Sequence, residues 1–297
     1  MLYNSTTNLL TLANGKTPKL PDGAFQDLMR FVFSIDEVKP ETLTEDAPRH
    51  FIQVHADTLT ESFSQVEMSP AMRTQLEQSA WIFSGFKTYH EMNEAVPSLI
   101  GEDGSRKTFE RFLKDVQKVD EQYNVNYLRA EYNFATQSAQ MAAKWEQIEA
   151  DGDDYDLQYR TAGDDRVRDE HAALDGITLP PSDPFWEENY PPNGWNCRCT
   201  AVQVRKGKYP HSDSRTAREK GREATSGKHQ DMMRFNPGKQ REVFPDYNAY
   251  TLSKCATCTK KDDLTLAANI TGNELCQACK VVRRQTRFDS NIKRKNG

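Results

Sequence analysis

The sequence lacks any long apolar run. The chain of 297 residues is 36% hydrophobic and 28% charged. A helix that spans a membrane needs roughly 18 or more consecutive apolar residues, and the sequence contains no such run. The first residues, from Met1 to Ser5, also lack the basic flank and apolar core of a secretion signal. We therefore expect a soluble, globular protein that stays in the reducing cytoplasm and contacts no membrane.

Cysteine is scarce, and its spacing is informative. Four of the six cysteines form two Cys-x-x-Cys pairs that are separated by seventeen residues, and these are Cys255, Cys258, Cys276 and Cys279. Two such pairs can close a tetrahedral shell around one structural Zn²⁺ ion. A segment this short has little core, so the metal would supply much of its folding energy. The pattern predicts a small zinc-ribbon-like or treble-clef-like module, and the alternative is a set of free or redox-active thiols.

Basic residues are sparse in the first two thirds of the chain and abundant in the last third. Residues 1–204 hold 34 acidic and 18 basic side chains, a net charge of −16. Residues 205–297 hold 10 acidic and 21 basic side chains, a net charge of +11. This asymmetry predicts an acidic body with a basic C-terminal part. That part can bind DNA without sequence preference, it can bind an acidic protein surface, or it is merely a solvated surface.

Apolar residues recur at helical spacing in several stretches before residue 150. The stretches that we interpret as helices are 24–34, 69–90, 108–122 and 124–149. Ser69 and Pro70 supply an N-cap and a first helical position for the second of them. A weaker helical stretch contains His55 and Phe63, after an interruption at Pro48.

The most distinctive stretch lies between residues 159 and 204. Its spaced residues are Tyr159-Arg160-Thr161, Asp165-Arg166-Val167-Arg168, His171, Leu174-Asp175-Gly176, Asp183-Pro184-Phe185-Trp186, Pro191-Pro192-Asn193-Gly194-Trp195 and Asn196-Cys197-Arg198-Cys199. We interpret this block as a strand, a turn, a short helix capped by Asp164-Asp165, an ordered loop and a second strand. The whole sequence therefore predicts an α+β fold: a mainly helical body with a small β element around 159–161 and 197–204, plus the zinc-ribbon-like C-terminal module.

Two cysteines and a histidine of the block form a second candidate metal cluster. Cys197 and Cys199 are two residues apart in the expected strand, so their side chains share a face. Thiolate and imidazole are the usual ligands of zinc, and His171 is the nearest histidine. Because Cys-x-Cys is a weak signal and no fourth ligand is obvious, the alternative is a pair of small buried thiols beside a structural histidine.

The charged residues of the block admit two interpretations. Five residues resemble the acid–base cluster of a hydrolase or nuclease, but no recognised catalytic motif has their spacings. They are Asp164, Asp165, Arg166, Arg168 and His171. Alternatively, charge-assisted hydrogen bonds and two large aromatic residues hold a proline-rich loop in place. We expect this structural motif, and no enzyme activity. Its residues are Asp165, Arg166, Arg168, Asp175, Trp186 and Trp195.

Residues 159–204 resemble the core of the phage Mu F-like family of head morphogenesis proteins, the minor head proteins of tailed phages and prophages. The resemblance extends over roughly residues 75–250. It implies a virion component that acts beside the portal in capsid morphogenesis and DNA packaging, with portal, capsid and scaffold proteins as partners. It also implies a place in the head interior or at the portal vertex, after assembly in the host cytoplasm.

The resemblance suggests three parts and leaves two other functions open. The parts are an N-terminal leader and helical region (1–68), the phage Mu F-like domain (69–250) and a four-cysteine zinc-binding module with a basic tail (251–297). The first alternative is a toxin-delivery or nuclease-like protein that carries a phage head domain, as in relatives whose chains continue into such an effector. The second is a zinc-ribbon protein that binds nucleic acid. We favour the head protein because of the breadth of the motif match. Residues 255–297 contain no histidine for a nuclease site, and no base-reading helix is visible.

Overall fold

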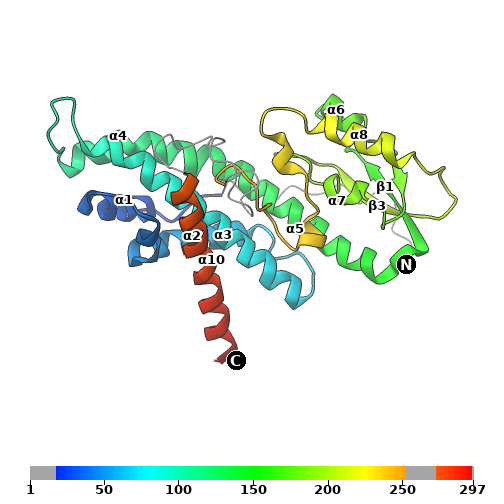
Figure 1. Ribbon diagram of the computed structural model, residues 1–297, viewed down its shortest axis with the longest axis horizontal. Coiled ribbons are helices and arrows are strands. Elements are labelled where there is room, and N and C mark those ends of the chain that lie inside the picture. The colour runs from blue at the N-terminus through cyan, green and yellow to red at the C-terminus, as the bar shows by residue number, and fades with distance from the viewer. Residues whose placement is uncertain (1–17, 252–271, 296–297) are drawn as a thin grey trace. The chain divides into compact units, whose positions relative to one another are not determined.

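The computed structural model describes residues 18–251 and 272–295 (Figure 1). It is mainly helical and has one small antiparallel sheet, which confirms the predicted α+β class. The longer helices are α1 (Ala24–Ser34), α2 (Asp46–Glu61), α3 (Pro70–Ala95), α4 (Phe109–Asp120), α5 (Leu128–Asp151), α8 (Ser214–Ala224) and α10 (Gly272–Lys295). The short helical elements are η1 (Pro40–Thr44), η2 (Val96–Leu99), η3 (Glu121–Tyr127), η4 (Gly152–Asp154), α6 (Asp169–Ala172), α7 (Phe185–Glu188), η5 (Gln230–Met233) and α9 (Pro237–Gln240). No helix of the described residues is long and apolar enough to cross a membrane.

The chain forms two compact units that alternate along the sequence. The described parts of unit 1 are Ser62–Leu76 and Ala130–Pro245, and those of unit 2 are 18–61, Glu77–Arg129, 246–251 and 272–295. The change from one unit to the other falls inside α3 and near the start of α5. The division into 1–68, 69–250 and 251–297 stays a prediction about sequence regions.

Unit 2 is a helical assembly. The apolar face of α1, which includes Phe25, Leu28 and Val32, is buried against α2 and α4. Pro48 does not interrupt a helix, because it lies in the first turn of α2, where a missing backbone N–H leaves no hydrogen bond unmade. In α10, Leu275, Ala278 and Val282 are buried, and the helix packs against η1.

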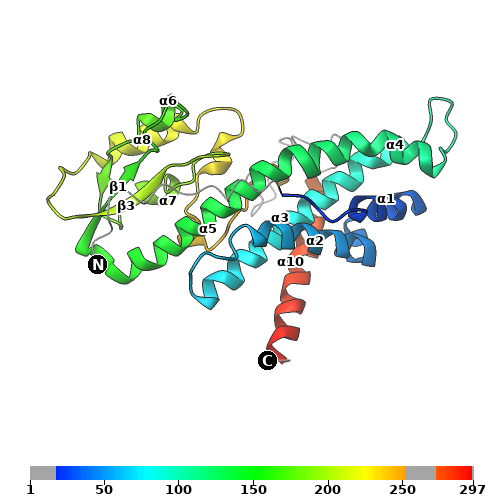
Figure 2. The same cartoon turned by 180° about the vertical axis from the view of Figure 1, so that it is seen from behind.

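Helices α4 and α5 were predicted as separate, and they are joined without a break. The seven residues of η3 form a π-helix between them, so α4, η3 and α5 follow one another directly (Figure 2). Tyr123 of η3 is fully buried, and its carbonyl accepts a hydrogen bond of 2.6 Å from the buried ammonium group of Lys87. The amide of Leu128 also donates to this carbonyl, as the i+5 bond of a π-helix requires. The ammonium group of Lys87 is therefore a second donor to the same oxygen.

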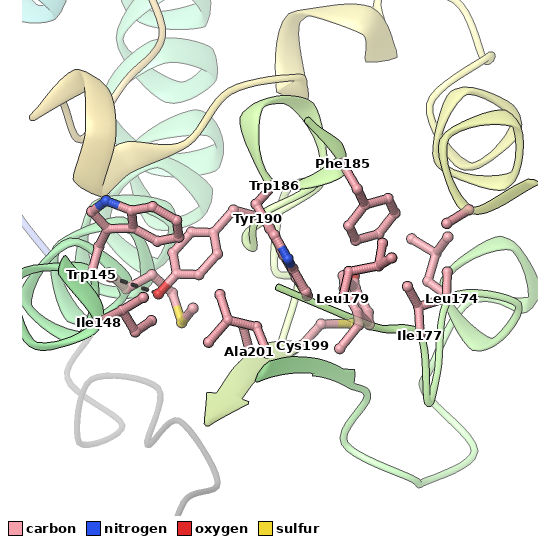
Figure 3. Packing of buried hydrophobic residues seen from close by; sticks show 14 of the residues in the cluster. Trp145, Ile148, Leu174, Ile177, Leu179, Phe185, Trp186, Tyr190, Cys199 and Ala201 are labelled. Atoms are coloured by element: carbon pink, nitrogen blue, oxygen red, sulfur yellow. Dashed lines mark hydrogen bonds between the residues drawn. The ribbon is translucent and has the colours of Figure 1, made fainter. Parts of the chain in front are cut away.

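Unit 1 contains a three-stranded antiparallel sheet with the order β2-β1-β3. Strand β1 (Tyr155–Arg160) is central; it pairs with β2 (Thr178–Leu179) on one side and with β3 (Thr200–Arg205) on the other. The predicted β element is therefore confirmed, although the second long strand begins at Thr200 and not at Cys197. A single apolar cluster is built from the sheet, α5, α7 and α8 (Figure 3). In it, Trp145 packs edge-on against Tyr190, and the Tyr190 hydroxyl donates to the carbonyl of Met141.

Residues 205–231 are rich in polar and basic side chains, and no helix was predicted there. They contain α8, which lies beside α6 and α7 (Figure 1). Asp213 caps the helix by accepting a hydrogen bond from the amide of Thr216 at 2.8 Å. Its buried residues are Ala217, Gly221 and Ala224, which recur at helical spacing but are small. A search for large apolar residues misses a helix whose buried face is made of alanine and glycine.

Candidate functional site

The central strand of the sheet fixes the residues of the distinctive block. Tyr159 in β1 is fully buried, and its backbone N–H donates to Ile177 while its carbonyl accepts from Gly176. On the other side, Tyr159 is paired with Ala201 of β3. The two segments that flank β1 are therefore held in a defined register against it. One of them carries His171, and the other carries Cys197 and Cys199.

A tight turn delivers the two cysteines to the sheet. The amide of Cys197 donates to the carbonyl of Gly194 at 3.1 Å, and Asn196 has a φ of 55°. Asparagine tolerates this left-handed conformation better than most residues do. The chain then runs towards β3, and alternate side chains point to opposite faces. Cys197 and Cys199 are both buried, whereas the intervening Arg198 reaches Asp164 in an ion pair of 2.5 Å.

His171 lies in the one-turn helix α6 and is 3% exposed. Its backbone amide donates to Arg168, and its carbonyl accepts from Leu174. The turn that follows contains Gly176 with a φ of 79° and returns the chain to β2. The imidazole is buried next to the segment that carries the cysteines.

The three side chains meet in the interior of unit 1. The Nδ1 atom of His171 is 3.7 Å from the sulfur of Cys197 and 3.7 Å from that of Cys199. All three ligand atoms lie within 4.8 Å of one another, and all three residues are buried. The prediction that both cysteines share a face is confirmed, although they precede the strand. A cluster of two thiols and one imidazole can hold a metal ion.

The two thiols have different proton affinities. A hydrogen bond between the two thiols lowers the pKa of Cys197 well below its ordinary value, and contact with His171 adds to this effect. The same thiol–thiol hydrogen bond raises the pKa of Cys199, and burial adds to the rise. One sulfur of the pair is therefore the preferred site for the first negative charge.

The charged residues of the block make a different set of contacts from the predicted one. Asp164 does not cap a helix with Asp165, because its carboxylate accepts from the amide of Arg166 and pairs with Arg198, and α6 begins only at Asp169. These contacts, first of all that with Arg198, hold the pKa of Asp164 below its ordinary value. Asp165 is exposed and makes no hydrogen bond or ion pair with a described residue.

Arg168 and Asp175 fasten the two flanking segments. The guanidinium group of Arg168 donates to the carbonyl of Trp195 at 2.6 Å. The carboxylate of Asp175 accepts from the backbone amide of Thr161 at 2.8 Å and from its hydroxyl group. Arg166 is exposed and pairs only with Asp164 among the described residues.

The two tryptophans are in different environments. Trp186 is fully buried beside Phe185 and Tyr190, as Figure 3 shows. Its carbonyl also accepts a hydrogen bond from the buried amide of Asn236. Trp195 is half-buried and packs against Phe134 with ring centres 5.0 Å apart. Both are apolar contacts of the loop, and Trp186 has the larger buried surface.

The acid–base interpretation of the block has little geometric support. His171 faces two buried sulfurs, whereas Asp165 is exposed to solvent and Arg168 binds a backbone carbonyl. The sequence analysis assigned no role to Arg198, which forms an ion pair with Asp164, or to Tyr159, whose buried hydroxyl donates to Asn193. The alternation of Cys197, Arg198 and Cys199 was the available signal for Arg198, because it places the arginine on the face opposite the thiols.

Half of the predicted C-terminal zinc site lies within the described residues. Cys276 and Cys279 are three positions apart in α10, so they lie on the same side of the helix, and both are half-buried. The guanidinium Nε of Arg283 donates to the sulfur of Cys279 at 3.4 Å. Cys255 and Cys258 lie outside the described residues. Gly272 and Asn273, which precede the second pair, begin α10.

Comparison with known proteins identifies the same part of the chain. Residues 99–202 match the family model described as "Phage Mu protein F like protein". A segment of 69 residues is 44% identical to "Putative capsid assembly protein F" of Escherichia phage Mu, and it covers 23% of this chain and 16% of that protein. A segment of 63 residues is 41% identical to the Mu-like prophage FluMu F protein of Haemophilus influenzae, and it covers 19% and 15% of the two chains.

These matches define a region and not a whole protein. They span less than a fifth of the length of either relative. No solved structure matches the chain significantly. The family match ends at residue 202, so it contains Tyr159, His171 and both cysteines of the cluster. Residues 99–202 of this chain are therefore similar to the phage Mu F-like family.

Proposed function

We propose that the protein is a structural and assembly component of a tailed phage or prophage head, a minor head protein that acts at or near the portal. The observation that carries the proposal is the family match over residues 99–202, together with the local identity to the phage Mu and FluMu F proteins. The expected partners are portal, capsid and scaffold proteins. The expected location is the virion, after assembly in the host cytoplasm.

The chemistry of the block favours an architectural role. Its conspicuous polar groups are bound to one another or to backbone: Asp164 to Arg198, Arg168 to Trp195, and Asp175 to Thr161. Catalysis needs side chains that can reach a bound substrate and exchange protons with it. We propose that the block holds the fold of unit 1 and that the protein has no enzyme activity. Purified protein that cleaves DNA, RNA or a nucleotide, and loses this activity in a folded His171→Ala variant, would overturn this part.

Co-assembly with the portal is the direct test of the head role. The tagged chain is produced together with the portal, capsid and scaffold proteins encoded in the same phage or prophage. We expect portal rings to retain the chain through purification, and mass spectrometry to find it in isolated heads. A portal ring from an unrelated phage is the control. Heads that form and package DNA normally without containing the chain would contradict the proposal.

We also propose that Cys255, Cys258, Cys276 and Cys279 bind one structural zinc ion. The support is the spacing of the two pairs and the common side of α10 on which the second pair lies. Replacing Cys276 and Cys279 by serine should remove about one zinc per chain from protein purified without added metal. Ser290→Ala and Thr286→Ser, which lie in the same helix, are matched controls. Zinc content that is unchanged by the cysteine substitutions would refute this assignment.

A further inference from the structure

The cluster of His171, Cys197 and Cys199 has a geometry that hydrogen bonding does not require. Both sulfurs lie 3.7 Å from the same nitrogen, Nδ1 of His171. An imidazole nitrogen has either one lone pair or one proton, so it makes one good hydrogen bond. This nitrogen can therefore form a good hydrogen bond with only one of the two sulfurs, although both lie at the same distance. A metal ion placed between the three atoms would bind all of them at once.

The distances fit a tetrahedral zinc ion. Zinc binds sulfur at about 2.3 Å and nitrogen at about 2.0–2.1 Å, which places sulfur and nitrogen roughly 3.5 Å apart and two sulfurs roughly 3.8 Å apart at the tetrahedral angle. The observed sulfur–nitrogen distances are 3.7 Å, and all three ligand atoms lie within 4.8 Å of one another. Small side-chain adjustments are enough to bring the three atoms into the first coordination shell.

Each ligand is held by backbone structure that does not depend on the others. His171 is set by α6 and by the turn at Gly176 that leads into β2. Cys197 and Cys199 are set by the Gly194–Cys197 turn and by β3. At Gly194 an added Cβ atom would lie 3.7 Å from Cε1 of His171 and 3.2 Å from a guanidinium nitrogen of Arg168. The contact with the imidazole is an ordinary van der Waals distance, and the tighter one is with Arg168, which also binds the carbonyl of Trp195 in this turn.

We propose that His171, through Nδ1, and Cys197 and Cys199, through their thiolates, bind a zinc ion in unit 1 that is separate from the C-terminal four-cysteine site. Among the described histidine, cysteine and acidic residues these three supply the ligands there, and a water molecule takes the fourth position. The ion ties the segment before β2 to the segment before β3, on either side of the central strand. When zinc binds, the two thiol groups lose their protons to solvent, and no electron is transferred.

The experiment uses the full chain in which Cys255, Cys258, Cys276 and Cys279 are all replaced by serine, so that the other set of thiols is absent. Protein purified without added metal should contain about one zinc per chain, the occupancy of a single tetrahedral site. Cys197→Ser, Cys199→Ser and His171→Asn should each reduce this content severalfold. Tyr190→Phe is the matched control, because it removes a buried hydroxyl group that donates to the carbonyl of Met141 and not to a ligand, and it should retain the zinc.

A cobalt measurement keeps the proposal testable if the ligand variants fail to fold. Co²⁺ that replaces zinc in the folded four-serine protein should give thiolate-to-cobalt charge-transfer absorption and the strong visible bands of a tetrahedral site. Chelation should then lower the thermal midpoint, since an ion bound only by the folded state stabilises it. Folded four-serine protein that binds neither zinc nor cobalt would overturn the proposal. This holds if the two remaining thiols titrate as reduced groups, and it holds equally if a mass lower by two hydrogen atoms shows that they form a disulfide.

Discussion

Trp186 is in the part of unit 1 where single-residue substitutions should have the largest effect. Its side chain is fully buried, and its ring centre lies 4.8 Å from that of Phe185. Truncating a buried aromatic residue to alanine typically costs roughly 3–5 kcal/mol, because the transfer energy is lost and a cavity remains. We expect Trp186→Ala to lower the free energy of unfolding by about this amount in a denaturant titration, or to prevent folding. Trp195→Ala, at a half-buried position, is the control and should cost clearly less.

Buried histidines make unit 2 sensitive to acid. Burial lowers the pKa of His90 from 6.5 to about 4, although its Nε2–H donates a hydrogen bond to the carbonyl of Tyr250. Burial also lowers the pKa of His55 well below its ordinary value. The unfolded chain therefore takes up protons at a higher pH than the native chain does. The stability that depends on neutral His90 is complete above pH 6.5 and is lost as the pH falls towards 4.

We accordingly expect the free energy of unfolding to decrease between pH 7 and pH 5 and this decrease to be smaller in His90→Gln. The glutamine amide can still donate to the Tyr250 carbonyl but does not titrate. The full effect of His90 is on the order of 3 kcal/mol, since one pKa unit corresponds to about 1.4 kcal/mol. His50→Gln, at an exposed position of α2, is the control and should leave the pH dependence unchanged. An equal flattening in both variants would contradict the assignment to His90.

The sequence was enough to predict which residues form the cluster of His171, Cys197 and Cys199. It predicted only in part which residues the neighbouring side chains contact. The period of two residues in a strand was enough to place Cys197 and Cys199 on one face and Arg198 on the other. It did not distinguish Asp164 from Asp165 as the partner of Arg198, because both are adjacent carboxylates in a glycine-containing turn. That choice depends on the direction of the chain after Gly163, which has a φ of 70°. It is a tertiary property that spacing does not encode.

At the scale of whole elements, α3 and α10 meet at a position that only glycine fills without strain. A Cβ atom added to Gly85 of α3 would lie 2.6 Å and 2.7 Å from the two γ-carbons of Val282 in α10. Alanine is favoured over glycine in a helix by about 1 kcal/mol, so a gain is expected where space permits. Here we expect Gly85→Ala to lower the thermal midpoint and to increase hydrogen exchange in α10. The β-branched valine has little rotamer freedom to move aside.

A double-mutant cycle tests the cause. In Val282→Ala both γ-carbons are absent, so Gly85→Ala should cost much less in that background than in the parent protein. Equal costs in the two backgrounds would show that the close approach of α3 and α10 at this point is not the source of the destabilisation.

The elements that were predicted correctly are those with large apolar residues at regular spacing. Helices α1, α3, α4 and α5 show such stripes, and each was located to within a few residues, except that α3 continues to Ala95. The π-helix between α4 and α5 was missed because it leaves no local composition signal. One of its carbonyls also accepts from Lys87, which is far away in the sequence. Helix α8 was missed for a different reason, since its buried face is made of small residues.

At the scale of the whole molecule, the uneven distribution of charge predicts weak DNA binding. Residues 205–297 carry a net charge of +11, and lysine and arginine bind duplex DNA with release of about 0.9 counterion per phosphate contact. We expect the protein to bind duplex DNA without sequence preference and with an affinity that falls steeply as salt increases. Fluorescence anisotropy over a series of salt concentrations measures the slope.

Truncation after Gln285 should make that slope shallower. It removes Arg287, Lys293, Arg294 and Lys295 but keeps Leu275, Ala278 and Val282, the buried residues of α10. A truncation after Tyr250 would remove more charge but also this packing. Substituting the same four basic residues by glutamine is a control for the loss of chain length. Binding that does not respond to salt, or that is unchanged by both variants, would count against a role for this part in contacting DNA.

The alternation of the two units has a consequence for how this protein is handled and how its region of similarity is understood. The region 99–202 that matches the family begins in unit 2 and ends in unit 1. A fragment with these limits would lack α1, α2 and α3 from unit 2, and α8 and the segment 62–76 from unit 1. The region of sequence similarity is therefore not a domain that can fold on its own. Subcloning at its edges would expose two incomplete apolar interiors, so the smallest useful fragment must begin before α1 and extend beyond Pro245.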